Sequence, residues 1–305
     1  MRIAVVGPSD WFAHHYPERW RGDPDVICPD VHVGDYSWLM VLRNWRPDVT
    51  LFYRPELYPE RFLQHIDGFR IAFLTEPLPA LKGKKLETTA ESALRLQVYK
   101  RMAWHAFHRR LFYDQGRAET VAFLGWPIDG FRPLPIDTAN FYPPRPGTTR
   151  PIDICFTGKA TPHRIARLDR LRQVGVNSPP LKFVWVVHGL DAGGSARLFR
   201  RSKVVLNVHA DGVPAQEPRL YLAAACGCRV VSEPLSTAPA KLRPWIVEEP
   251  REWTYEVLRE HLVAQAAQSW SPADEAERLA LGVGRLLAEE YCELSGKMGQ
   301  IEGMS

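Results

Sequence analysis

Short runs of aliphatic and β-branched residues recur along the chain, and most of them end at a glycine, a proline or a polar turn. Such runs are typical of strands buried on both faces of a parallel sheet. They alternate with stretches of helical periodicity, of which the clearest are residues 162–172, 196–202 and 271–291. This alternation predicts an α/β fold with strands at residues 3–6, 26–28, 49–53, 71–74, 121–124, 152–156, 183–187, 204–208, 229–232 and 245–247.

The stretch from residue 203 to residue 233 shows this alternation most completely. A strand is followed by a loop rich in Gly, Pro and Asp, then by strong helix formers that end at Gly227, and then by another strand. We expect Glu217 to cap the helix and Pro218 to occupy its first turn. The result is a βαβ unit whose loop lies where open α/β sheets bind ligands, and the free N–H groups of the helix start favour a phosphate there.

Residues 81–117 are unusually basic, with nine Lys and Arg against three Asp and Glu and with interleaved aromatic residues. Their spacing predicts a helical segment. Most amphipathic helices of this kind are a solvated face over a core stripe. The basic residues from 82 to 117 also leave two partners open, a membrane surface and the phosphate backbone of DNA.

Composition limits the class of protein. The chain has 305 residues, of which 45% are apolar, which is enough for two domains of ordinary size. The formal charge of +4 suits anionic ligands such as nucleotides. Five cysteines without paired CxxC motifs favour a reducing compartment, and the sequence has neither a secretory signal nor an apolar run long enough to span a bilayer. We therefore expect a cytoplasmic protein.

Prolines mark the domain boundary. Seven of the 26 prolines fall between residues 126 and 151, where they exclude a helix or a central strand. This segment predicts an extended linker. The expected organisation is an amino-terminal α/β domain at residues 1–130, a linker at 131–151, a second α/β domain at 152–270, a helix at 271–294 that packs back on the first domain, and a disordered tail at 295–305.

Three segments carry a resemblance to a known family. The first is PRLYLAAACGCRVV at residues 218–231, and the second is LPIDTANFYP at residues 134–143. The third is Gly158-Lys159 directly after a strand, with Arg164 five residues further on. Together they resemble glycosyltransferases of the GT-B fold, in particular the spore-maturation-type (CgeB-like) and related family 1/4-type sugar transferases.

The resemblance implies two Rossmann-like domains that face a cleft, with an acceptor on the first and a nucleotide sugar on the second. It implies transfer of the sugar to an acceptor hydroxyl without a metal or a cofactor, the nucleotide sugar being a co-substrate. The acceptor stays open between a glycan, a small molecule and a hydroxymethylated DNA base. The donor-binding candidates are Gly158, Lys159, Arg164, His188, His209, Gln216, Glu217 and Arg219.

Candidate catalytic groups lie in the first domain. Glu76 follows the strand at 71–74 closely, where the resembling family places an acidic group near the acceptor, although a surface carboxylate is the alternative reading. An inverting mechanism needs a base, for which Glu76, His14 and His15 are the candidates; a retaining mechanism needs none. The acceptor-side candidates are Ser9, Lys82, Lys84 and Lys85.

The chain departs from the family at one place. Retaining members carry two glutamates in the loop and helix before the glycine, and Pro214 and Leu222 stand at those positions here. This departure leaves the stereochemical course and the nucleotide open. It also leaves an alternative function, a non-catalytic nucleotide-sugar-binding or assembly protein. Asp23 and Asp25 have the spacing of a metal-binding motif, but Pro24 between them favours a turn.

Overall fold

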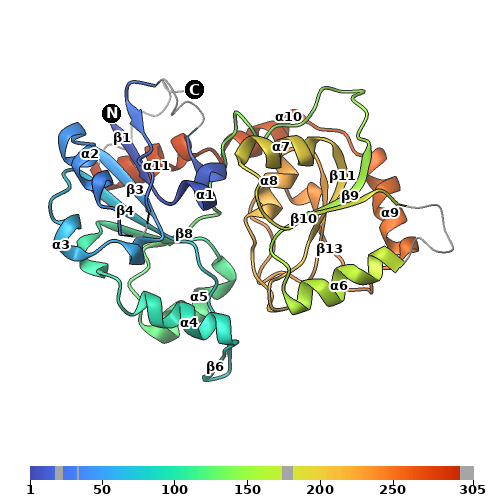
Figure 1. Ribbon diagram of the computed structural model, residues 1–305, viewed down its shortest axis with the longest axis horizontal. Coiled ribbons are helices and arrows are strands. Elements are labelled where there is room, and N and C mark those ends of the chain that lie inside the picture. Colours follow the sequence, from blue (N-terminus) through green and yellow to red (C-terminus); the bar gives the residue numbers. More distant parts are fainter. Residues whose placement is uncertain (18–22, 33, 174–180, 296–305) are drawn as a thin grey trace. The chain divides into compact units, whose positions relative to one another are not determined.

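The computed structural model describes residues 1–17, 23–32, 34–173 and 181–295 (Figure 1). The chain forms two compact units: residues 1–137 with the residues from 280 onward, and residues 138–279. The proline-rich segment at 131–151 is thus shared between the units. The tail expected at 295–305 lies outside the described residues except for its first residue, which ends a helix.

The first unit is built on a parallel six-stranded sheet of order β2-β1-β3-β4-β7-β8. Short helices connect the strands, and a small antiparallel hairpin of β5 (Ala80–Lys82) and β6 (Lys85–Glu87) is attached. The strands are β1 (Ile3–Val6), β2 (Val26–Ile27), β3 (Val49–Tyr53), β4 (Phe69–Leu74), β7 (Arg109–Phe112) and β8 (Gly130–Phe131), and the α-helices are α1 (Ser9–Phe12), α2 (Ser37–Trp45), α3 (Glu60–Leu63), α4 (Ala90–Tyr99), α5 (Ala118–Leu124) and α11 (Val283–Ser295).

The second unit has a parallel five-stranded sheet of order β10-β9-β11-β12-β13. The expected βαβ unit is confirmed, because β11 and β12 pair directly in parallel and α8 connects them. The strands are β9 (Ile152–Thr157), β10 (Phe183–Val186), β11 (Ser202–Asn207), β12 (Arg229–Ser232) and β13 (Ile246–Glu248), and the α-helices are α6 (Pro162–Gln173), α7 (Ala192–Arg200), α8 (Arg219–Ala225), α9 (Tyr255–Ala266) and α10 (Pro272–Leu279).

Buried apolar strands and one buried charge hold the first unit together. All of β3 is buried, as expected for a central strand covered on both faces. The C-terminal helix α11 adds Val283 and Leu287 to this core. Its fully buried Glu290 pairs with Arg109 of β7 at 2.7 Å and with Arg132 at 3.2 Å. Because a buried carboxylate is costly without its partners, these pairs fix α11 to β7 and to the residue that follows β8.

The strand predicted at residues 121–124 is wrong. These residues are the second half of α5, which ends at Gly125 with a φ of 66°. A run of four apolar residues does not distinguish a strand from a half-buried helix. Thr120 and Val121 are buried while Phe123 is exposed, which is the one-sided pattern of a surface helix.

The helical interpretation of residues 81–117 is also wrong for most of its length. Only α4 (Ala90–Tyr99) is an α-helix of that segment; the hairpin β5–β6 precedes it, and β7 follows it as an inner strand of the sheet. Strand β7 was not predicted because basic residues occupy its first half. Arg109 and Arg110 begin it and pair with carboxylates, so that Leu111 and Phe112 are buried as sheet core.

Two further boundaries differ from the prediction. Residues 271–291 form two helices, α10 and α11, separated where Gly282 makes a parallel bridge to Ile136. Helix α7 begins at Ala192 rather than near residue 196, because the side chain of Asp191 accepts a hydrogen bond from Gly194 N at 2.6 Å. That bond caps the helix at an earlier residue than its apolar pattern indicates.

Candidate functional site

The strand order of the second sheet places a switch point between β9 and β11. After β9 the chain forms β10 on one side and then crosses to β11 on the other. Ligands of open α/β sheets bind in the crevice outside the carboxyl ends of two such strands. Gly158 follows β9 there, and the loop leading to α8 follows β11.

Two buried guanidinium groups converge on Gly158. A β-carbon built on this glycine would lie 3.1 Å from Arg219 Nη2 and 3.2 Å from Arg164 Nη1. The φ of Gly158 is 149°, a value that residues with a side chain rarely adopt. Both guanidinium groups also lie over the ring of Phe156, at 5.4 Å for Arg164 and 4.6 Å for Arg219. Glycine is therefore the residue that lets both cations reach the end of β9.

The backbone of the sheet edge holds these two side chains. Arg164, in the first turn of α6, donates from Nε to Val208 O at 3.0 Å and from Nη1 to Lys159 O at 3.3 Å. Arg219, at the start of α8, donates from Nε to Thr157 O at 2.7 Å and from Nη1 to Asn207 Oδ1 at 2.8 Å. These bonds fix the position of both guanidinium groups before a ligand arrives.

The charges at this point are not balanced. Glu217 Oε1 lies 3.5 Å from Arg164 Nη2, and no other carboxylate among the described residues pairs with either guanidinium group. Burial lowers the pKa of Arg219 to about 10, with Glu217 opposing and Arg164 adding to that effect, so the group keeps its charge at neutral pH. Exposed Lys159 adds a further cation on the same loop. The site is suited to an anion such as a diphosphate.

The predicted cap of α8 is wrong. Pro218 is the N-cap residue, and the carboxylate of Glu217 lies toward Arg164 instead. The end of the helix is as predicted, since Gly227 has a φ of 64° and Cys228 N donates back to Ala223 O at 3.2 Å. A glycine in this conformation is the usual end of a helix. The anion site accordingly rests on guanidinium groups more than on the start of this seven-residue helix.

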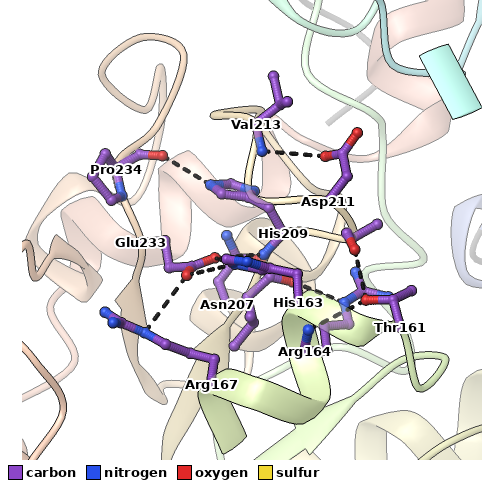
Figure 2. Close-up of polar contacts among 12 residues, drawn as sticks. Thr161, His163, Arg164, Arg167, Asn207, His209, Asp211, Val213, Glu233 and Pro234 are labelled. Carbon is purple, nitrogen blue, oxygen red and sulfur yellow. Dashed lines mark hydrogen bonds and ion pairs between the residues drawn. The ribbon is translucent and has the colours of Figure 1, made fainter. Parts of the chain in front are cut away.

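A buried carboxylate forms a second polar cluster beside this site (Figure 2). Glu233, directly after β12, accepts a hydrogen bond from His209 N at 2.8 Å, and its oxygens lie 2.9 and 3.1 Å from His163 Nε2. Arg167 Nε lies 3.6 Å from the same carboxylate. One side chain thus joins the start of α6, the loop after β11 and the end of β12.

Thr161, directly before α6, and His163 in its first turn also fix the loop after β11. Thr161 Oγ1 donates to Ala210 O at 2.6 Å. The ring of His163 lies so close to Gly212 that a β-carbon there would be 3.0 Å from Cε1. Residues 209–212 are therefore held by the start of α6 and by Glu233.

The other predicted donor residues have different surroundings. Gln216 is buried and donates from Nε2 to Thr237 O at 3.2 Å, so it connects two loops. His209 is buried and donates from Nε2 to Pro234 O at 2.8 Å; its Nδ1 has no hydrogen-bond partner within the described part of the chain. His188 is exposed beyond the end of edge strand β10.

Sequence reasoning missed Glu233 and His163. A signal was present, because Glu233 follows a predicted strand directly, in a position comparable to that of Glu76 in the first domain. His163 sits next to Arg164 in the predicted phosphate segment, but the sequence does not show that it reaches a strand 70 residues further on.

In the first unit, Glu76 lies at the carboxyl end of β4 as part of an ion-pair network. Its carboxylate is 2.8 Å from Arg54 Nη1 and 2.9 Å from Arg95 Nη1. Ser9 lies after β1 and donates from Oγ to Asp30 Oδ2 at 2.6 Å. Glu76 is thus an oriented carboxylate, and Ser9 is engaged with a neighbouring loop.

The two histidines form a short 3₁₀ turn after α1. His15 is buried and its Nδ1 lies 2.5 Å from Pro135 O. A carbonyl oxygen can only accept, so Nδ1 carries the proton. Burial, with His14 nearby, lowers the pKa of His15 to about 3. An imidazole with so low a pKa is a weak base at neutral pH. His14 is half-buried, with its ring centre 6.2 Å from that of His15.

Because His15 is buried and neutral, we expect the folded protein to lose stability in mild acid. It is neutral in the folded chain down to about pH 3, whereas in the unfolded chain it binds a proton below its ordinary pKa of 6.5. The contribution of neutral His15 to the free energy of unfolding is therefore fully present above pH 6.5 and is lost progressively as the pH falls toward 3. Between pH 7.5 and pH 5 we expect it to lower the free energy of unfolding by about 2 kcal/mol. Urea unfolding at both pH values measures the change in the free energy of unfolding. In His15→Asn this change should be smaller by about 2 kcal/mol. An equal change in both proteins would contradict the low pKa of His15.

The predicted acceptor-side lysines lie at the tip of the β5–β6 hairpin. Lys82, Lys84 and Lys85 are exposed, and Lys82 Nζ is 3.1 Å from Glu87. Much of the remaining basic charge of this segment is neutralised within the unit, as the pairs of Arg95 and Arg109 with carboxylates show. The basic segment thus combines arginines of α4 and β7 that pair with carboxylates, a cationic hairpin, and the exposed Lys100 and Arg101 after α4.

Residues 1–17, 23–32, 34–173 and 181–295 contain no group of three or more His, Cys, Asp or Glu side chains placed to hold a metal ion. None of their helices combines the length and the apolar character that crossing a membrane requires.

Comparison with known proteins identifies the fold. No protein family's sequence profile matches the chain, and no curated protein sequence matches it. Among solved structures, it resembles sucrose-phosphate synthase from Thermosynechococcus elongatus, with 11% identity over 98% of this chain and 99% of that one and a TM-score of 0.55. It also resembles AviGT4, a glycosyltransferase involved in avilamycin A biosynthesis, with 14% identity over 98% of both chains and a TM-score of 0.56. The chain has the GT-B fold, as the sequence predicted.

Proposed function

We propose that this chain is a glycosyltransferase that moves a sugar from a nucleotide-sugar donor, held by the second unit, to an acceptor hydroxyl held by the first. The observation that carries the proposal is the pair of buried guanidinium groups, Arg164 and Arg219, at the switch point beside Gly158. They oppose one carboxylate, Glu217, and so favour a doubly charged group. The GT-B fold and the two transferase neighbours agree with this reading, as do the sequence segments that resemble spore-maturation-type enzymes.

The proposed chemistry follows from that charge. When the bond between the sugar carbon and the phosphate oxygen breaks, the departing nucleoside diphosphate gains negative charge. Fixed cations stabilise this charge more in the transition state than in the bound donor. Arg164 and Arg219 supply such cations, with Lys159 at the edge of the site. We propose that no metal is needed for this step.

The acceptor proton has two routes in this proposal. In a retaining reaction the departing phosphate oxygen takes it. In an inverting reaction a side chain of the first unit takes it. Glu76 is paired with two guanidinium groups, and the pKa of His15 is lowered to about 3, so both are better suited to orient a hydroxyl than to remove its proton. These two environments favour the phosphate route, and His14 is the remaining candidate base for an inverting reaction.

Calorimetry with nucleotides tests the proposal. UDP, GDP, dTDP and ADP, their sugar conjugates and the matching monophosphates would be titrated into the full chain, without metal and then with Mg²⁺. We expect one nucleoside diphosphate to bind, and to bind at least about 10-fold tighter than its monophosphate, because two guanidinium groups contact the second phosphate. If no nucleotide binds, or if the monophosphate binds equally well, the proposed donor site is wrong.

A second candidate function is donor binding without transfer. The observation that favours it is the presence of Pro214 and Leu222 where retaining relatives carry glutamates. Leu222 is buried in the core of the second unit and has no polar group that could take the place of a ligand-binding acid. Nucleotide binding in the calorimeter, together with no release of nucleoside diphosphate from the bound conjugate in the presence of acceptors, would identify this function.

A further inference from the structure

The first sheet has a switch point of its own. From β1 the chain goes to β2 on one side and then to β3 on the other, so a crevice is expected outside the carboxyl ends of β1 and β3. Two residues follow those ends: Trp11 on α1 after β1, and Arg54 directly after β3. Glu76 follows the next strand, β4. Three adjacent strands thus present their following residues at one edge.

Trp11 is the unusual member of this group. It is 55% exposed, although it lies at the edge where ligands of this fold class bind. The guanidinium carbon of Arg54 lies 5.4 Å from the centre of the indole ring. An indole that is braced on a cation and still open to solvent offers a rigid apolar surface with a polar rim.

The backbone of Arg54 is held in an unusual conformation. Its φ and ψ are both 56°. This is the left-handed region, which a residue with a side chain occupies at a cost of about 1–3 kcal/mol. In this conformation the guanidinium group of Arg54 lies between Trp11 and the carboxylates of Glu56 and Glu76. Strain of this kind persists where the surrounding contacts require it, and it is enriched at ligand sites.

The charges beside Trp11 are balanced, unlike those at Gly158. Arg54 pairs with Glu56 and Glu76, and Glu76 also pairs with Arg95, so two guanidinium groups face two carboxylates in the ion pairs that the structure describes. The side chain of Glu56 is fully buried, and its Oε2 receives no hydrogen bond within the described residues. Such a network repels the phosphates of a nucleic acid about as much as it attracts them. It favours a neutral ligand with hydroxyl groups that both donate and accept.

We infer that this edge binds the ring of a neutral sugar, with one face of the ring packed on Trp11 and its hydroxyls bonded to Glu76 and Arg54. The C–H groups on one face of a sugar ring form an apolar patch that matches an aromatic surface. The inference rests on the proposed function and narrows it: the acceptor is a carbohydrate, and Trp11 is the residue that selects it. A DNA base with its phosphates is disfavoured by the balanced charges.

The test uses the full chain, which has ten tryptophans, labelled with 5-fluorotryptophan. The ¹⁹F signal of Trp11 is the one that disappears in Trp11→Phe. The probes are the methyl glycosides of glucose, galactose, mannose, N-acetylglucosamine and rhamnose, and a single-stranded oligonucleotide. We expect at least one glycoside to shift the Trp11 signal and the oligonucleotide to leave it unchanged. Trp11→Ala should weaken that glycoside at least about 10-fold, while Phe123→Ala, which removes another exposed aromatic ring of the same unit, should not.

The outcomes separate this inference from the proposed function. If no glycoside shifts the Trp11 signal, or if only the oligonucleotide does, the inferred acceptor class is wrong. Nucleoside diphosphate binding is measured on the same sample by calorimetry. Nucleotide binding without any glycoside effect overturns this inference alone, and a glycoside effect without nucleotide binding overturns the proposed donor site alone.

Discussion

Replacing Arg164 with glutamine is expected to weaken nucleoside diphosphate binding about 100-fold, the largest functional effect of a single substitution in this chain. A charge-assisted hydrogen bond contributes about 1.5–3 kcal/mol, and loss of the upper part of that range corresponds to two orders of magnitude in affinity. Glutamine can still donate to Val208 O, which Arg164 Nε contacts at 3.0 Å, so the end of β11 keeps a partner. Calorimetry with the nucleotide that binds the natural protein measures the loss.

The matched control is Lys203→Gln, which removes one positive charge from the same unit. Lys203 lies near the amino end of β11 and pairs with Asp153 at 2.6 Å, at the opposite edge of the sheet from Gly158. If affinity depends on contact with the diphosphate, this substitution leaves it unchanged. Equal losses in both variants would show a general charge effect, and an unchanged affinity in a folded Arg164→Gln protein would place the phosphate site elsewhere.

Local sequence determined the strands whose burial is complete. All of β3 is buried and β12 carries three buried residues in four, and the β-branched and apolar residues of both strands predicted them with the observed bounds. Strand β7 could not be found in this way, since its arginines are neutralised by Asp129 and by Glu290, which is 181 residues away from Arg109. Its apolar half is too short to be recognised alone.

The same distinction applies to the candidate site. Gly158, Arg164 and Arg219 could be chosen as candidates because each is tied to a recognisable local element, a strand end or a helix start. The prediction that Glu217 caps α8 was wrong because its carboxylate pairs with Arg164 of α6 rather than with the N–H groups at the start of α8. Trp11 and Glu233 were missed because the residues around them come from segments far apart in the sequence. The sequence alone does not show that these segments lie together.

Glu233→Ala is expected to lower the free energy of unfolding by about 3 kcal/mol, the largest stability effect we predict. The substitution leaves His209 N without its acceptor at 2.8 Å, His163 Nε2 without its partner at 2.9 Å, and Arg167 without its nearest carboxylate. Removing one member of a buried pair costs about 3–5 kcal/mol because the others stay buried and uncompensated. The expectation is at the lower end, since His163 and Arg167 are partly exposed. Urea unfolding of the full chain gives the number.

Glu260→Ala supplies the comparison, because Glu260 pairs with Arg251 at 2.9 Å on the surface of the same unit. A surface pair of this kind contributes less than about 1 kcal/mol, so this variant should unfold nearly as the natural protein does. Glu233→Gln should fall between the two, since the amide oxygen can still accept from His209 N while the charge is gone. That order follows only if the Glu233 carboxylate joins α6 to the loop after β11. If Glu233→Ala costs no more than Glu260→Ala, the loop is held by Thr161 and the packing of Gly212 alone, and Glu233 has another role.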